Sequence, residues 1–161
     1  MNIDKMIKKR DIEALIGLLS KDADIYDNYN IDLHTKAVYA LGILGDPLAL
    51  DPLIKAYHEQ HKYVRYAVIE TLGQFHDPRA LDILKEALCD PDDFNARLAA
   101  VRSISRLNDP HAIVPLIKAV YDDAVSVSRE ASKALDKLLE HPDAVQELIT
   151  ALIENRTTAY A

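Results

Sequence analysis

The chain has 161 residues, of which 49% are hydrophobic and 28% charged, and its formal net charge at pH 7 is −7. This composition is typical of one globular domain and excludes a disordered or fibrous chain. The acidic balance argues against a general affinity for nucleic acid or anionic membranes, although it permits a local basic patch.

The predicted elements repeat along the chain. An amphipathic segment at 10–19 and a second one at 33–46 come first. Later segments open with Asp-Pro at positions 46, 77 and 109, spaced by 31 and then 32 residues, and a related His-Pro opening follows at 141. A period of this size is typical of a solenoid, in which each unit buries its apolar face only against its neighbours.

Each unit is predicted to hold two helices. In the first helix, apolar residues recur at spacings of three and four and therefore share one face. The Asp of Asp-Pro can cap this helix, and Pro suits its first turn. Because Pro52 and Pro115 come five residues after the Pro of Asp-Pro, we expect Asp-Pro-x-Ala to form a turn that precedes the helix. In the second helices, small residues such as Gly42 and Gly73 allow close packing.

The outward positions of the second helices carry the candidate binding residues. Read four residues apart, the first two helices present the aromatic residues Tyr39 and Tyr66. The third and fourth helices present cations, namely Arg102, Arg106, Arg129, Lys133 and Lys137. Like charges at i and i+4 cost a helix about 0.2–0.5 kcal/mol each. The cations therefore indicate either a groove for an anionic partner or a solvated face with internal ion pairs.

The pattern D-P-x-A-x-x-x-L-x-x-A-L, a short loop, and V-R-x-A-A-x-x-A-L-G resembles the HEAT-like repeat family, specifically the short units named after phycobilisome lyases. The residues that carry the resemblance are Asp46-Pro47, Asp77-Pro78, Asp109-Pro110, Val64-Arg65 and Leu72-Gly73. The resemblance implies an all-α fold of about nine helices, a right-handed α-α superhelix whose second helices line the concave side. It also implies that Arg65 and Arg97 tie adjacent units together. In this frame a single domain over 1–161 holds units at 8–45, 46–76, 77–108 and 109–140 and a closing helix at 141–155.

The sequence offers no catalytic or metal-binding motif. "HEQH" at 58–61 places its histidines at i and i+3, whereas a zinc-protease helix needs them at i and i+4. Some HEAT-like proteins are diiron hydroxylases with His-Glu pairs on their second helices, which lack such pairs here, and others are DNA glycosylases that rely on Trp, which this chain lacks. The aspartates of loop 20–32 lack the Gly and distal Glu of a calcium loop. We therefore expect no catalytic residue, no metal and no cofactor.

These observations predict a non-enzymatic binding or scaffold module whose concave face holds a protein with an acidic surface. Two alternatives remain open: a subunit of a lyase-type or other HEAT-like enzyme, and nucleic-acid binding through the basic patch. The single cysteine, Cys89, cannot form an internal disulfide, and the N-terminus has no signal-peptide core. We therefore expect a cytoplasmic protein that does not bind membranes.

Overall fold

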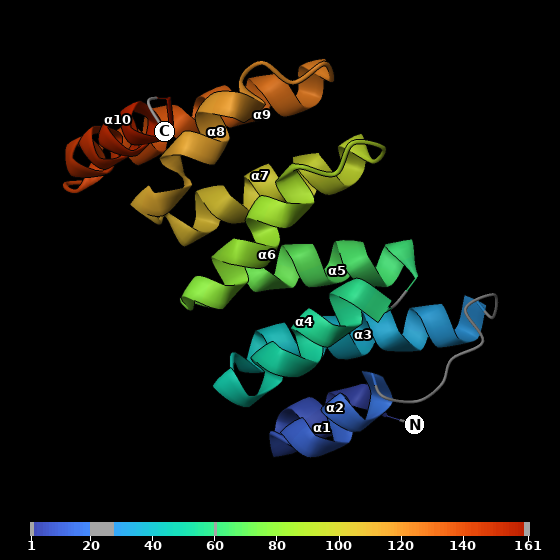
Figure 1. Cartoon of the computed structure of the whole chain (residues 1–161). Helices are drawn as coiled ribbons and strands as arrows, with labels where there is room; N and C mark the ends of the chain where they lie inside the picture. The colour runs from blue at the N-terminus through green and yellow to red at the C-terminus, as the bar shows by residue number, and fades with distance from the viewer. Residues whose placement is uncertain (1, 20–27, 60, 160–161) are drawn as a thin grey trace. The chain divides into compact units, whose positions relative to one another are not determined.

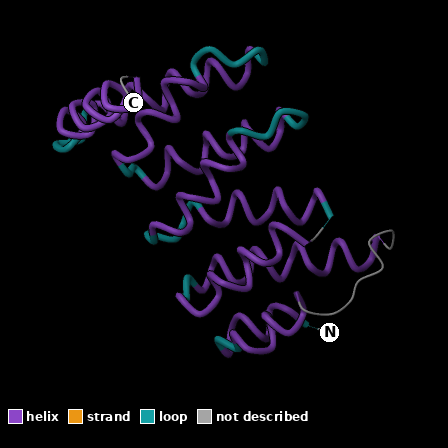
Figure 2. Tube along the Cα trace, viewed as in Figure 1, coloured by secondary structure: helices purple, strands orange, loops and turns teal. Residues whose placement is uncertain are grey.

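A computed structural model describes residues 2–19, 28–59 and 61–159. Within these ranges the chain forms ten α-helices, two short 3-10 turns and no strand, which confirms the predicted all-α class (Figures 1 and 2). Most of the Asp-rich loop at 20–32 lies outside the described residues. None of the described helices combines the length and the apolar character needed to cross a bilayer.

The chain divides into two compact units, Met1–Ile83 and Leu84–Ala161, with the boundary inside α6 (Pro78–Leu88). The helices that lie wholly in the first unit are α1 (Ile3–Lys9), α2 (Ile12–Leu19), α3 (Asn28–Leu44), α4 (Leu50–Glu59) and α5 (Lys62–Leu72). α2 packs on α3, α4 packs on α5, and α3 and α5 lie side by side (Figure 1). The second helices of these pairs are therefore direct neighbours.

α1 lies outside the repeat frame that the sequence indicates. It begins after Asn2, whose side chain accepts a hydrogen bond from the Lys5 amide, and it ends at Lys9, followed by Arg10 in the left-handed conformation with φ 52°. α1 packs against both α2 and α3. It accounts for the tenth helix, beyond the nine or so that the repeats predict.

The second unit contains the end of α6 and four further helices. They are α7 (Phe94–Leu107), α8 (Ile113–Ala119), α9 (Val125–Leu139) and α10 (Ala144–Ala159). α8 packs on α9, α7 and α9 lie side by side, and α10 packs on α8 and α9. This unit therefore repeats the arrangement of second helices seen in the first.

Two of the three Asp-Pro pairs, Asp46-Pro47 and Asp109-Pro110, form the expected turns, whereas Asp77-Pro78 leads directly into α6. The Asp46 carboxylate accepts a hydrogen bond from the Leu48 amide, and a 3-10 turn at Pro47–Ala49 leads into α4. Asp109 caps the 3-10 turn Pro110–Ala112 before α8 in the same way. The α-helices begin two residues earlier than Pro52 and Pro115, so each of these prolines still lies in a first turn, where its missing N–H is not needed.

The core confirms the role of small residues between the second helices. Ala37, Ala100 and Ala131 are fully buried. At Gly42 on α3, an added Cβ would lie only 2.7 Å from the Thr71 side-chain methyl on α5. The two helices approach closely because one of them carries no side chain at the contact.

Candidate functional site

The five predicted cations lie on α7 and α9, which pack side by side, and we call the exposed surface of these two helices the α7–α9 face. All of Arg102, Arg106, Arg129, Lys133 and Lys137 are exposed. Lys137 Nζ donates a hydrogen bond to the Ser105 carbonyl at 2.7 Å, which joins the C-terminal ends of the two helices. Lys133 lies 3.6 Å from the Glu130 carboxylate. Lys137 therefore helps to hold the face together, and Lys133 is partly neutralised.

Arg102 and Arg129 are the most available of these cations. Within the described residues neither side chain forms a hydrogen bond or an ion pair. α7 contains no acidic residue, whereas α9 carries Glu130 and Asp136. The positive charge of α7 is therefore not offset within its own helix.

The N-terminal ends of α7 and α9 are joined by Arg97, which is 8% exposed. Its Nε and Nη2 donate to the two carboxylate oxygens of Asp122 at 2.7 and 2.9 Å, and Nη2 also donates to Asp123 at 2.8 Å. Nη1 donates to the Asp90 carbonyl at 3.0 Å. The hydrogen bonds from Arg97 lower the pKa of Asp122, and those to Asp122 raise the pKa of Arg97. Both side chains are therefore charged at neutral pH.

The aromatic candidates belong to the first unit and engage other residues there. Tyr39 Oη donates to Glu70 Oε2 at 2.6 Å, across the contact of α3 with α5. Partial burial, together with Glu70, raises the pKa of Tyr39 to about 12, so the phenol stays protonated at neutral pH. The Tyr66 ring packs edge-on against Tyr63 with centroids 6.1 Å apart.

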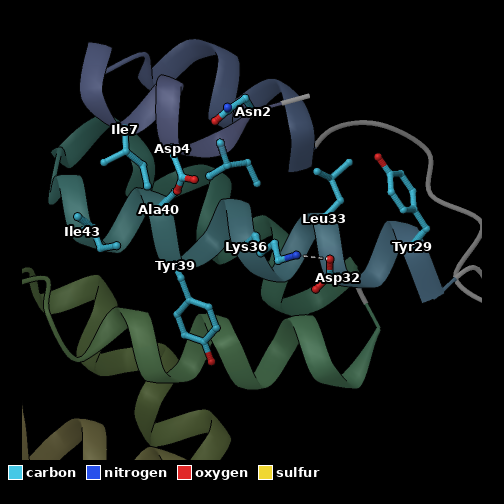
Figure 3. Close-up of a pocket in the computed structure, with 11 residues that line it drawn as sticks. Asn2, Asp4, Ile7, Tyr29, Asp32, Leu33, Lys36, Tyr39, Ala40 and Ile43 are labelled. Carbon is cyan, nitrogen blue, oxygen red and sulfur yellow. Dashed lines mark hydrogen bonds and ion pairs between the residues drawn. The ribbon is translucent and has the colours of Figure 1, made fainter.

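Tyr39 also lines a cleft of about 540 Å³ against α1 and α3 (Figure 3). Figure 3 shows Asp4, Lys36 and Asp32 along it, and Lys36 pairs with Asp32 at 2.6 Å. The volume lies within the range of small-ligand sites, which is about 300–1,000 Å³. The repeats could not predict this cleft because α1, which forms part of its wall, lies outside their frame.

The described residues do not fit an iron centre. No three His, Cys, Asp or Glu side chains among them converge on a point that could hold a metal ion. In the HEQH segment, His61 caps α5, and its Nδ1 accepts a hydrogen bond from the Tyr63 amide at 3.4 Å. Gln60 of that segment lies outside the described residues. The described residues therefore offer no ligand set for a diiron site.

A small cluster of titratable side chains, separate from the α7–α9 face, lies where α10 meets the 3-10 turn before α8. His111 Nδ1 lies 2.7 Å from Asp109 Oδ1, and Nε2 lies 3.9 Å from Glu147 Oε2 on α10. The hydrogen bond to Asp109, together with the negative charges of Asp109 and Glu147, raises the pKa of His111, whereas partial burial and the nearby Lys85 oppose this shift.

We expect the contribution of His111 to stability to fade as pH rises. A histidine whose folded-state pKa is raised stabilises the fold fully below its unfolded pKa, and this stabilisation is lost as pH climbs through the folded pKa. The substitution His111→Asn should therefore lower the melting temperature at about pH 5.5 and have little effect on it at about pH 8. Thermal unfolding followed by circular dichroism at both pH values measures the difference, and a gap that widens with pH would contradict the assignment.

Stacked helix pairs whose second helices lie side by side, connected by Asp-Pro turns in a 31-to-32-residue frame, define a repeat protein of the HEAT class. The family model described as HEAT repeats matches residues 50–136, and the one described as PBS lyase HEAT-like repeat matches residues 35–59. The first match covers more than half of the chain. The chain belongs to the HEAT-repeat family.

Similar proteins carry the name of an enzyme. Deoxyhypusine hydroxylase of Drosophila pseudoobscura pseudoobscura is 30% identical over 86 residues, and that of Drosophila melanogaster is 28% identical over 86 residues. Each match covers 53% of this chain and 26% of the relative. The structure of human deoxyhypusine hydroxylase in complex with glycerol superposes with a TM-score of 0.66 at 21% identity, covering 84% of this chain and 46% of that one. The structural likeness shows the fold, and the chain matches only part of each relative.

These relatives correct the functional prediction. The sequence predicted a non-enzymatic binding or scaffold module, whereas both curated relatives are named as enzymes. The prediction was wrong because it inferred function from the absence of local motifs, and a HEAT fold is compatible with several functions. Of the alternatives considered, an enzyme subunit agrees best with the relatives.

Proposed function

We propose that this chain is a component of an enzyme that modifies a protein, and that its α7–α9 face binds an acidic segment of that substrate protein. The observation that carries the proposal is the match over 86 residues to two curated hydroxylases. The described residues offer no metal-ligand cluster. We therefore propose that they recognise the substrate and that groups outside the described residues carry out the reaction.

The charge of the α7–α9 face supports an acidic partner. Three of its cations lie on α9 and two on α7, all exposed, in a chain of net charge −7. Each exposed ion pair contributes only about 0.2–1 kcal/mol, so several pairs must act together. Potentials of opposite sign also speed the encounter and exclude partners of the wrong charge.

A protein segment fits this face better than a nucleic acid does. Specific nucleic-acid binders often neutralise about 6–10 phosphates, whereas this face offers five cations with Glu130 and Asp136 on the same helix as three of them. The rest of the chain, being acidic, would repel a long polyanion. The single cysteine fits the cytoplasmic location that we propose for the chain.

The test compares cells that lack the chain with cells that express wild type, the face variant Arg102→Glu/Arg129→Glu, or the control variant Lys55→Glu/Lys118→Glu. The two changed arginines hold no described partner, so folding should change by less than about 0.5 kcal/mol per site. Mass spectrometry of cellular proteins should show a covalent modification that is lost without the chain and lost in the face variant. Wild type and the control variant should restore it.

The first modification to score is the addition of one oxygen atom, because both curated relatives are named hydroxylases. If no covalent modification of any protein depends on the chain, the enzyme role is wrong. If the face variant restores the modification as well as wild type does, the enzyme role stands and the α7–α9 face is not its recognition site. Binding of duplex nucleic acid that weakens steeply with salt would replace the protein partner with a nucleic acid.

A further inference from the structure

Two rows of side chains run along the α7–α9 face in the same chemical order. The row on α7 begins with Phe94, which is 47% exposed, and passes through Leu98 to the two arginines. The row on α9 begins with Val125, which is 69% exposed, and continues directly to the three cations. Successive members are four residues apart, so neighbouring members lie on the same side of the helix, and each row turns around its helix by about 40° per step. Both rows therefore change from apolar to cationic towards the C-terminal end of the helix.

The rows are held side by side at both ends. Phe94 and Val125 are 31 residues apart, which is one repeat, so they occupy equivalent positions on neighbouring helices. Arg97 joins the N-terminal ends through Asp122, and Lys137 joins the C-terminal ends through the Ser105 carbonyl. The apolar residues of both rows therefore face the same end of the surface, and the cations face the other.

Negative charge reinforces this polarity. At the apolar end, Asp92 is exposed, and the Asp123 side chain is 91% exposed although it accepts one bond from Arg97. Phe94 and Arg106 are twelve positions apart, which corresponds to about 18 Å along the helix. Over this length the surface passes from apolar groups flanked by carboxylates to cations.

We propose that the α7–α9 face takes an extended peptide with an apolar anchor at one end and carboxylates at the other, a proposal that rests on the function proposed above. The carboxylates of such a peptide are attracted by the cations and repelled by Asp92 and Asp123, so they occupy the C-terminal end of the face. The anchor then contacts Phe94 and Val125. An extended chain advances about 3.3 Å per residue, so about five or six residues separate the anchor from the last carboxylate.

Two fluorescent peptides of identical composition provide the test with the purified full chain. In the block peptide two adjacent Leu residues precede a run of Glu, and in the alternating peptide the same residues are interspersed. Fluorescence anisotropy should show that the block peptide binds at least about tenfold more tightly. Phe94→Ser/Val125→Ser should remove this advantage while leaving the weaker binding of the alternating peptide unchanged.

Val145→Ser is the matched control, because Val145 is 66% exposed on α10 and lies outside both rows. It should change neither affinity. Arg102→Glu/Arg129→Glu should abolish the binding of both peptides.

If the wild-type chain binds the two peptides with equal affinity, the proposed apolar-to-cationic order along the α7–α9 face is wrong. The cations would still form a recognition site for an acidic peptide. If neither peptide binds, or if duplex DNA binds more tightly than the block peptide, the face does not take an acidic peptide. The cellular modification assay decides separately whether the chain is an enzyme component.

Discussion

Replacing Arg97 with Met should destabilise the second unit by about 2–4 kcal/mol. The change removes five hydrogen bonds and leaves the Asp122 carboxylate, which is 10% exposed, without its cation. Removing one partner of a buried ion pair typically costs about 3–5 kcal/mol. We expect less because Asp122 still accepts a hydrogen bond from the Ala124 amide. Urea unfolding followed by circular dichroism measures the loss.

The matched control is Arg102→Met on the same helix, which should change stability by less than about 0.5 kcal/mol because Arg102 is exposed. Arg97→Met/Asp122→Asn should cost less than the two single changes together, since it leaves no buried charge unpaired. The difference in unfolding free energy between wild type and Arg97→Met should also become smaller at acidic pH. The lowered pKa of Asp122 contributes stability that is present above its unfolded pKa of about 3.9 and is lost as pH falls further. Equal stability of Arg97→Met and wild type at neutral pH would refute this role.

Gly42→Ala should destabilise the wild-type chain but stabilise a chain that carries Thr71→Ser. Alone, the new methyl would lie 2.7 Å from the Thr71 methyl between α3 and α5. Overpacking of this kind costs about 1–3 kcal/mol, which outweighs the gain of about 1 kcal/mol from replacing Gly with Ala in a helix. In a Thr71→Ser background the clashing methyl is absent, so Gly42→Ala should become stabilising. Unfolding free energies of the four proteins in this double-mutant cycle measure the reversal.

Gly17→Ala on α2 is the control, because among the described residues no atom beyond its chain neighbours and its own helix backbone lies within 4 Å of the added Cβ. It should stabilise the chain by about 0.5–1 kcal/mol in either background. If Gly42→Ala behaves like Gly17→Ala in wild type, the contact of α3 with α5 is looser than the distance indicates.

The sequence predicts the repeated part of this fold well because one physical pattern recurs there. Apolar residues at helical spacing and Asp-Pro turns in a constant frame leave few arrangements that bury every apolar face. For the same reason the frame places Arg102 and Lys133, 31 residues apart, at equivalent outward positions on neighbouring helices. α1 has apolar residues at helical spacing, at Ile3, Met6 and Ile7, but it has no Asp-Pro turn and lies before the repeat frame, so both the helix and the cleft beside it were missed.

The interactions of individual side chains could not be predicted from the same pattern. The bonds from Arg97 to Asp122 and from Lys137 to the Ser105 carbonyl join residues 25 and 32 positions apart, and they depend on rotamers that no periodicity specifies. The hydrogen bond of Tyr39 to Glu70 is of the same kind, and it turns a predicted binding residue into a contact between two helices. The relation to enzymes was predicted only as an alternative because a repeat frame reports how helices pack and carries little information on chemistry.

The division into two compact units has a consequence for how a bound partner would be detected. In a repeat array, stability is approximately a sum of local terms, and unfolding need not be a single all-or-none transition. A ligand on the α7–α9 face stabilises by mass action the part of the chain that must be folded to bind it. Saturating the α7–α9 face with a ligand should therefore slow amide hydrogen exchange in α7–α9 more than in α2–α5. Exchange rates would then locate the occupied face and also report the affinity.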